Sequence, residues 1–131
     1  MSKFPDLRLR RLRRTASIRD LNRETRLSVD DLICPIFVIH GQNVREEIIP
    51  MPGYNHLSLD QLPREFNQIA DLGIRAVLLF GLPSYKDSQG SGAYDSNGII
   101  QKAIRIAKSE VPNLTVVTDV CLCEYTDHGH C

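Results

Sequence analysis

The chain lacks any apolar run of the ~20 residues that a bilayer-spanning helix requires, and its first residues lack the apolar core of a signal peptide. It contains no tryptophan, and aromatic residues make up only 6% of its 131 residues. Nucleic-acid-binding segments interleave aromatic with basic side chains, and this sequence shows no such pattern. We therefore expect a cytoplasmic protein with neither a membrane nor a nucleic acid as its partner.

Net charge is zero, but the charges are unevenly distributed along the chain. Residues 1–26 hold nine Lys/Arg against three Asp/Glu, whereas the remainder holds seven against thirteen. The basic segment has too few apolar residues to form a core of its own. We predict that residues 1–31 form an arm that lies on a neighbouring subunit and that residues 32–131 form the folded part. Because the two parts carry opposite charge, the chain is suited to self-association.

Short apolar runs alternate with segments of helical periodicity in the folded part. Runs at 34–39, 76–81 and 115–122 predict strands, and the first two are apolar throughout, as strands buried on both faces are. Apolar residues at helical spacing predict helices near 62–72 and 98–110. This alternation indicates an α/β fold in which parallel strands lie side by side in sequential order, with both helices on one side of the sheet.

Local signals mark the ends of the expected helices. Ser58-Leu59-Asp60-Gln61 resembles a capping box, and Pro63 is tolerated in the first turn that follows. Gly73 is a suitable C-terminal stop, and Asn97 can cap the second helix.

Two further segments are predicted as loops. The polar stretch after the first strand contains Pro50, Pro52 and Gly53, which are typical of turns. Residues 82–96 are rich in glycine, serine and aspartate but lack the Lys-Ser/Thr ending of a phosphate-binding loop. We expect residues 82–96 to be a solvent loop or a flexible cover over an active-site mouth.

Three of the four cysteines lie within the last thirteen residues of the chain. In a strand that continues to residue 122, Asp119, Cys121 and Cys123 point to one face, and the turn at Gly129 lets Cys131 fold back towards them. Three thiolates with an open fourth position describe a catalytic zinc site. The carboxyl ends of parallel strands are also where α/β folds place their active sites.

The remaining candidates have plainer explanations. A cysteine pair alone is more often a pair of buried apolar residues, but the third cysteine together with His128 and His130 favours metal. His130 either binds a second ion or is only a neighbour of a ligand, and His128 is expected in the loop. We expect Cys34 to be a buried small side chain, and His40 and His56 to be exposed polar groups.

The segment Thr118-Asp119-Val120-Cys121-Leu122-Cys123-Glu124-Tyr125-Thr126-Asp127-His128-Gly129-His130-Cys131 resembles the zinc-binding signature of the delta-aminolevulinic acid dehydratase (porphobilinogen synthase) family. Further similar segments are spread over nearly the whole chain: Arg10-Arg11-Leu12-Arg13-Arg14, Arg23-Glu24-Thr25-Arg26-Leu27, Met51-Pro52-Gly53, Leu72-Gly73-Ile74 and Lys86-Asp87.

This resemblance implies a fold, a metal site and an activity. Cys121, Cys123 and Cys131 match the catalytic zinc ligands, Asp119 matches an aspartate that positions a substrate amine, and His130 matches a residue of an additional site for a divalent ion such as magnesium. The fold implied is a (β/α)8 TIM barrel whose N-terminal arm embraces a neighbouring subunit, in a homo-oligomer expected to be an octamer. The activity implied is the condensation of two molecules of 5-aminolevulinate to porphobilinogen, with loss of two waters, in tetrapyrrole and heme biosynthesis.

The resemblance covers only the N-terminal portion of that enzyme, up to about the third barrel strand. The family's two lysines that form Schiff bases with the substrates lie downstream of the cysteine signature, and Lys86, Lys102 and Lys108 fall in an early loop and a helix. We therefore expect a truncated barrel that is inactive on its own. From the residues alone, a small open sheet remains an alternative fold, and a non-catalytic zinc-binding α/β module remains an alternative function.

Overall fold

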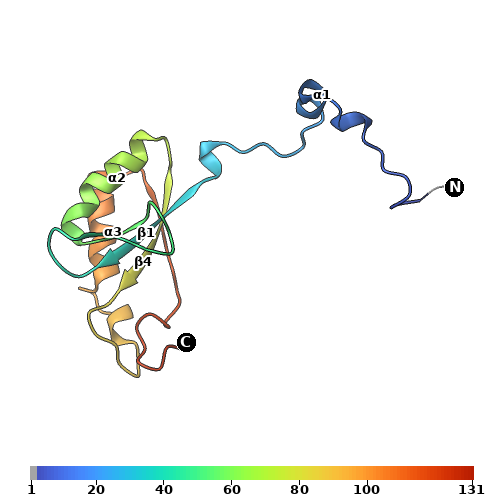
Figure 1. Ribbon diagram of the computed structural model, residues 1–131. Coiled ribbons are helices and arrows are strands. Elements are labelled where there is room, and N and C mark those ends of the chain that lie inside the picture. The colour runs from blue at the N-terminus through green and yellow to red at the C-terminus, as the bar shows by residue number, and fades with distance from the viewer. Residues whose placement is uncertain (1–2) are drawn as a thin grey trace.

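The structure, a computed structural model, describes residues 3–131 and contains one mixed sheet of five strands, in the order β2-β3-β1-β4-β5 (Figure 1). Three of them, β1 (Ile33–Ile39), β4 (Ala76–Leu82) and β5 (Thr115–Thr118), are parallel neighbours in sequential order. This arrangement confirms the predicted α/β fold and strand order, and it corresponds to the first part of a barrel that is not closed within this chain.

Helices α2 (Leu62–Asp71) and α3 (Ile99–Glu110) pack against each other and cover one face of the sheet (Figure 1). Their apolar residues meet alternate residues of the strands in one core, as period-2 alternation requires. The core consists of Ile36, Val38, Leu57, Leu62, Phe66, Ile69, Val77, Leu79, Ile99, Ala103, Ala107 and Leu114. Both helices and their position on one side of the sheet agree with the sequence prediction.

The opposite face of the sheet is only half-buried. Phe37 and Phe80 stack there with ring centroids 5.2 Å apart, and Leu78 lies on the same side. The prediction that strands 34–39 and 76–81 are buried on both faces is therefore wrong for this chain, because both helices lie on one side and nothing in residues 3–131 covers the other.

The segment predicted as a plain loop after β1 contains a β-hairpin. Strands β2 (Arg45–Glu47) and β3 (Asn55–Leu57) pair antiparallel, and β3 also pairs parallel with Phe37 and Val38 of β1. The prolines and Gly53 occupy the turn between the two strands, so the turn was recognised but the short strands beside it were missed.

Two predicted helix caps are also wrong. Ser58 precedes a short 3-10 helix (Leu59–Gln61) and makes no cap bond; its buried hydroxyl donates to the Asp60 carboxylate at 2.7 Å and accepts from the Val44 N–H at 2.8 Å. Ser58 thus ties the hairpin to the helix start. The N-cap of α3 is Gly98 rather than Asn97.

The predicted first-turn proline and glycine stop of α2 are both confirmed. Pro63 lies in the first turn of the helix. Gly73 follows the helix with φ of +83°, a conformation that a residue without Cβ adopts at low cost, and its N–H donates to the Ala70 carbonyl at 2.9 Å.

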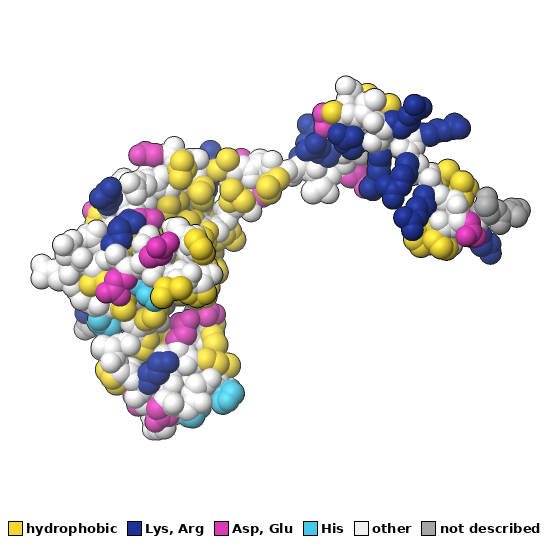
Figure 2. All heavy atoms as spheres, in the orientation of Figure 1, with side chains coloured by type: hydrophobic (Ala, Val, Ile, Leu, Met, Phe, Trp, Pro, Cys, Tyr) yellow, Lys and Arg dark blue, Asp and Glu magenta, His cyan; other side chains and the backbone are white. Residues whose placement is uncertain are grey.

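Residues 3–31 extend away from the sheet and contain no buried side chain (Figure 1). Helix α1 (Ala16–Leu21) and two short 3-10 helices (Arg11–Arg13 and Val29–Asp31) lie in this arm, whose basic side chains are visible in Figure 2. An exposed ion pair of 2.9 Å joins Asp30 to Arg75. That the arm contacts another subunit stays a prediction.

None of the helices within residues 3–131 has the length and apolar character needed to span a membrane.

Candidate metal centre

Cys121, Cys123 and Cys131 lie in a loop and not on a strand. Strand β5 ends at Thr118, four residues before the predicted end. The Asp119 carboxylate then accepts a hydrogen bond of 3.1 Å from the Cys121 N–H, which forms a local turn in place of a sheet pairing. The argument from side-chain alternation was therefore wrong for Asp119, Cys121 and Cys123.

The three cysteine side chains nevertheless converge. The Sγ atoms of Cys121, Cys123 and Cys131 all lie within 4.8 Å of one another. Zinc–sulfur bonds of about 2.3 Å in tetrahedral geometry place sulfurs about 3.8 Å apart, so small side-chain rotations bring these three to bonding distance. Soft thiolates of this kind select zinc, copper(I) or iron–sulfur clusters over magnesium or calcium. The residues present therefore fit a zinc ion with one position left open.

Hydrogen bonds between the thiols shift the pKa of two of these cysteines, Cys123 and Cys131. Contacts with Cys121 and Cys131 raise the pKa of Cys123 to about 11. The contact with Cys123 lowers the pKa of Cys131. The Cys123 thiol therefore holds a proton that a metal must displace when its thiolate becomes a ligand.

A cavity of about 290 Å³ adjoins the cysteine loop. Its walls come from β4, α3 and the loop, and they include Asp119 and Glu124 together with the aromatic side chains of Tyr94 and Tyr125. Burial raises the pKa of the Glu124 carboxyl, and the nearby charge of Asp119 raises it further. Two carboxyl groups and the Cys121 thiol thus share the wall of one cavity.

The histidines do not join the cluster. Among residues 3–131, the group that could hold a metal consists of the three cysteines alone. The backbone N–H of His130 donates to Nδ1 of His128 at 3.3 Å, in the turn that leads to Cys131. His40 is exposed as predicted, whereas His56 is half-buried with its ring edge against Phe37, so that expectation was wrong.

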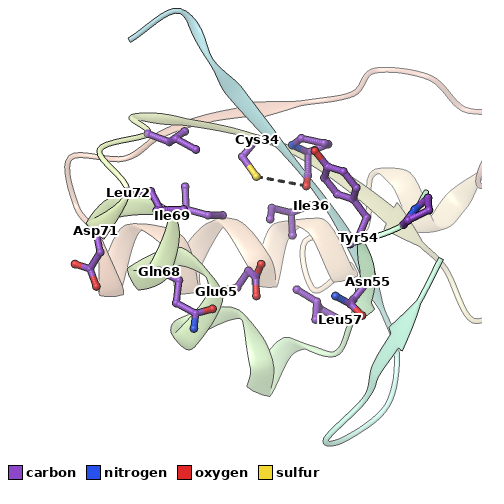
Figure 3. Close-up of a pocket in the computed structure, with 14 residues that line it drawn as sticks. Cys34, Ile36, Tyr54, Asn55, Leu57, Glu65, Gln68, Ile69, Asp71 and Leu72 are labelled. Carbon is purple, nitrogen blue, oxygen red and sulfur yellow. Dashed lines mark hydrogen bonds between the residues drawn. The ribbon is translucent and has the colours of Figure 1, made fainter. Parts of the chain in front are cut away.

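The fourth cysteine lines a different cavity, of about 650 Å³, between the start of β1 and helix α2 (Figure 3). Cys34 is only half-buried there, so the prediction of a buried side chain is wrong, although it packs against the core; this partial burial raises the pKa of its thiol. Figure 3 shows Glu65, Gln68 and Asp71 of α2 on the rim of this cavity. It lies at the amino end of the strands, away from the cysteine cluster.

Sequence reasoning missed the role of the loop at 82–96. Its backbone bridges the cysteine segment: the Asp87 N–H donates to the Tyr125 carbonyl at 3.2 Å, and the Asp127 N–H donates to the Asp87 carbonyl at 3.1 Å. The two segments consequently lie side by side (Figure 1). The sequence feature that indicates an ordered loop here is Ser91, four residues after Asp87. Its N–H and hydroxyl group both donate to the Asp87 carboxylate.

Sequential parallel strands, helices on one face and a thiolate cluster beyond the carboxyl ends of the strands together define the opening part of a TIM-type barrel with a candidate metal centre.

Comparisons with known proteins identify the family. The model of the family "Delta-aminolevulinic acid dehydratase" matches residues 6–131, and the chain belongs to this family. A delta-aminolevulinic acid dehydratase from Halalkalibacterium halodurans is 56% identical over 124 residues, which are 95% of this chain and 38% of that protein. The one from Archaeoglobus fulgidus is 50% identical over 131 residues, which are 100% of this chain and 40% of that protein.

A solved structure extends the match to three dimensions. The crystal structure of delta-aminolevulinic acid dehydratase (porphobilinogen synthase) from Toxoplasma gondii, in complex with the reaction product porphobilinogen, superposes with a TM-score of 0.84 at 30% identity. The match covers 95% of this chain and 36% of that one. This chain therefore spans less than half the length of each of these three relatives.

Proposed function

We propose that this chain carries the zinc centre and one wall of the active site of a porphobilinogen synthase, the lyase that condenses two molecules of 5-aminolevulinate to porphobilinogen with loss of two waters. The observation that carries the proposal is the convergence of three cysteine sulfurs within 4.8 Å, next to a cavity that Asp119 lines. The product bound to the Toxoplasma gondii relative supports a small-molecule ligand of this kind.

The residues of this chain have separate tasks in the proposed site. Zinc held by Cys121, Cys123 and Cys131 supplies a Lewis acid with an open position for a substrate oxygen or amine. Asp119 lines the same cavity as Cys121, and its carboxylate would hold the ammonium group of 5-aminolevulinate there. The proposed additional divalent ion, such as magnesium, involves His130.

The basic arm is assigned a role in subunit contact. We infer that residues 1–31 lie on a neighbouring subunit of a cytoplasmic homo-oligomer, an octamer in the complete enzyme. Exposed leucines support this inference, since Leu9 is 86% exposed and Leu21 is 85% exposed without any partner in residues 3–131. Burying such side chains against another chain stabilises an assembly by about 1.5–3 kcal/mol each.

One observation favours a second candidate, a non-catalytic zinc-binding module. None of the described residues that line the cavity beside the cysteines is a lysine. The ammonium group of Lys108 instead donates to the Leu114 carbonyl, which precedes the start of β5 and lies at its amino end. Schiff-base formation needs a lysine amine as nucleophile, and none of the described residues that line this cavity supplies one.

Zinc titration tests the metal centre. The purified chain should bind one zinc, and Cys123→Ala should lower its zinc affinity by more than about 100-fold. Even the loss of a residue that only orients a ligand lowers metal affinity by about 10–100-fold. Cys34→Ala is the matched control, because this cysteine lies outside the cluster, and it should bind zinc like the unmodified chain. Equal affinity of the Cys123→Ala variant would contradict the proposed site.

The activity is tested on the protein that the whole gene encodes. That protein should form porphobilinogen from 5-aminolevulinate, and Asp119→Ala should abolish product formation while one zinc still binds. The 131-residue chain alone should form none. A full gene product that binds zinc and forms no porphobilinogen would favour the non-catalytic module instead.

A further inference from the structure

The turn between the second and third cysteines is held by a buried hydroxyl group. Thr126 is only 4% exposed, whereas Cys131 is exposed. Oγ1 of Thr126 donates a hydrogen bond of 2.9 Å to the backbone carbonyl of His130. Because His130 directly precedes Cys131, this bond fixes the position of the peptide group that carries the third sulfur.

Thr126 is itself fixed within the turn. Its N–H donates to the Leu122 carbonyl at 3.0 Å, and its carbonyl accepts from the Gly129 N–H at 3.3 Å. Gly129 has φ of +70°, so the chain reverses at that point with little strain. Gly90 of the neighbouring loop also lies near Thr126, since an added Cβ would lie in van der Waals contact, 3.4 Å from Cγ2 of Thr126.

The loop at Asp87 holds the turn from outside. Its backbone makes the two hydrogen bonds to Tyr125 and Asp127 that flank Thr126. The Asp87 carboxylate shapes its own loop by accepting from the N–H groups of Gln89 and Ser91, each at 3.0 Å. Thr126 is thus the residue at which the Asp87 loop and the cysteine turn meet.

We propose that Thr126 is a positioning residue of the metal centre: its hydroxyl group holds the His130 carbonyl and thereby keeps Cys131 close to Cys121 and Cys123. This inference rests on the proposed zinc site and names a residue that serves it without binding the metal. Metal binding must supply the free energy needed to order its ligands, so a ligand that is already in place binds more tightly. Loss of the hydroxyl group should therefore weaken zinc binding and leave the fold intact.

The test is zinc affinity of the full chain with Thr126→Val, which keeps the shape of the side chain and removes the donor. We expect one bound zinc with an affinity about 10–100-fold lower, the range for residues that orient metal ligands. Cobalt(II) in place of zinc should show a weaker thiolate-to-metal charge-transfer band, because Cys131 is no longer held. Thr126→Ser should restore both, since it keeps the hydroxyl group. Thr115→Val, an exposed site at the start of β5, is the matched control and should behave like the unmodified chain.

The outcomes separate the two proposals. If the unmodified chain binds no zinc, the metal centre itself is overturned. If it binds zinc and Thr126→Val binds equally well, only the role of Thr126 is overturned. A loss of affinity that Thr126→Ser does not restore, together with a lower melting temperature, indicates a general structural role and also overturns it. If Thr126→Val does not fold by circular dichroism, Thr126→Ala replaces it: weaker zinc binding by the folded variant supports the proposal, and unchanged binding overturns it.

Discussion

Two adjacent leucines of β4 provide a direct measure of how differently the two faces of the sheet are covered. Leu79 is 1% exposed and belongs to the core under α2 and α3. Leu78, its neighbour on the same strand, is half-buried on the face that nothing in residues 3–131 covers. Truncation of Leu79 to alanine removes buried methyl groups and leaves a cavity, so it should cost about 3–4 kcal/mol. Leu78→Ala removes groups that are partly hydrated and leaves no closed cavity, so it should cost about 1 kcal/mol.

Urea unfolding followed by circular dichroism, at constant zinc concentration, measures both free energies. The midpoint should fall much further for Leu79→Ala, with the m-value unchanged in both variants. The measurement is made at a low and a high protein concentration, because a face that covers another copy in an oligomer becomes buried as concentration rises. Equal costs for the two substitutions at low concentration would refute the assignment of one covered and one open face.

Three further outcomes are expected. Zinc should bind more tightly at about pH 8 than at about pH 6, because the metal displaces thiol protons and the pKa of Cys123 is raised to about 11; calorimetry in buffers of different ionisation enthalpy counts these protons, and a pH-independent affinity would argue against thiolate ligands. Gly81→Ala should destabilise the chain by about 1–3 kcal/mol, since the added Cβ would lie 2.6 Å from Cγ1 of Ile100 and 2.8 Å from the Tyr125 hydroxyl oxygen; an unchanged urea midpoint is the contrary result. Deletion of residues 1–26 should reduce self-association, measured by sedimentation velocity, without lowering the unfolding midpoint of the monomer. If the truncated chain associates as strongly as the unmodified chain, the arm does not make the subunit contact.

Much of the fold could be predicted because hydrophobic patterning reports directly on burial. The apolar runs at 34–39 and 76–81 coincide with β1 and β4, and the helical spacing in 62–72 and 98–110 coincides with α2 and α3. The short strands β2 and β3 could not be found in this way. They are three residues each, and all three residues of β2 are exposed, so their pairing leaves almost no periodic signal.

The candidate metal centre was likewise predictable only in part. The cysteine spacing and the family resemblance identified Cys121, Cys123 and Cys131, because thiol groups at such spacing are rare outside metal sites. The reasoning about a shared strand face failed, because the Asp119 side chain forms a turn to the Cys121 N–H where the strand was expected to continue. A side chain that bonds to nearby backbone competes with sheet pairing, and its success depends on whether a partner strand is present.

The sequence by itself determined the segments that become β1, β4, α2 and α3, the basic character of the arm and the three cysteines that could hold a metal. Only the tertiary structure decided how the third sulfur reaches the other two. Cys131 lies eight residues beyond Cys123 on an exposed turn, and its position depends on the buried Thr126 hydroxyl and on the Asp87 loop, which lies some forty residues earlier in the chain. Hydrogen bonds between such distant segments leave no local pattern, because each is formed only after the strands and helices between them have packed.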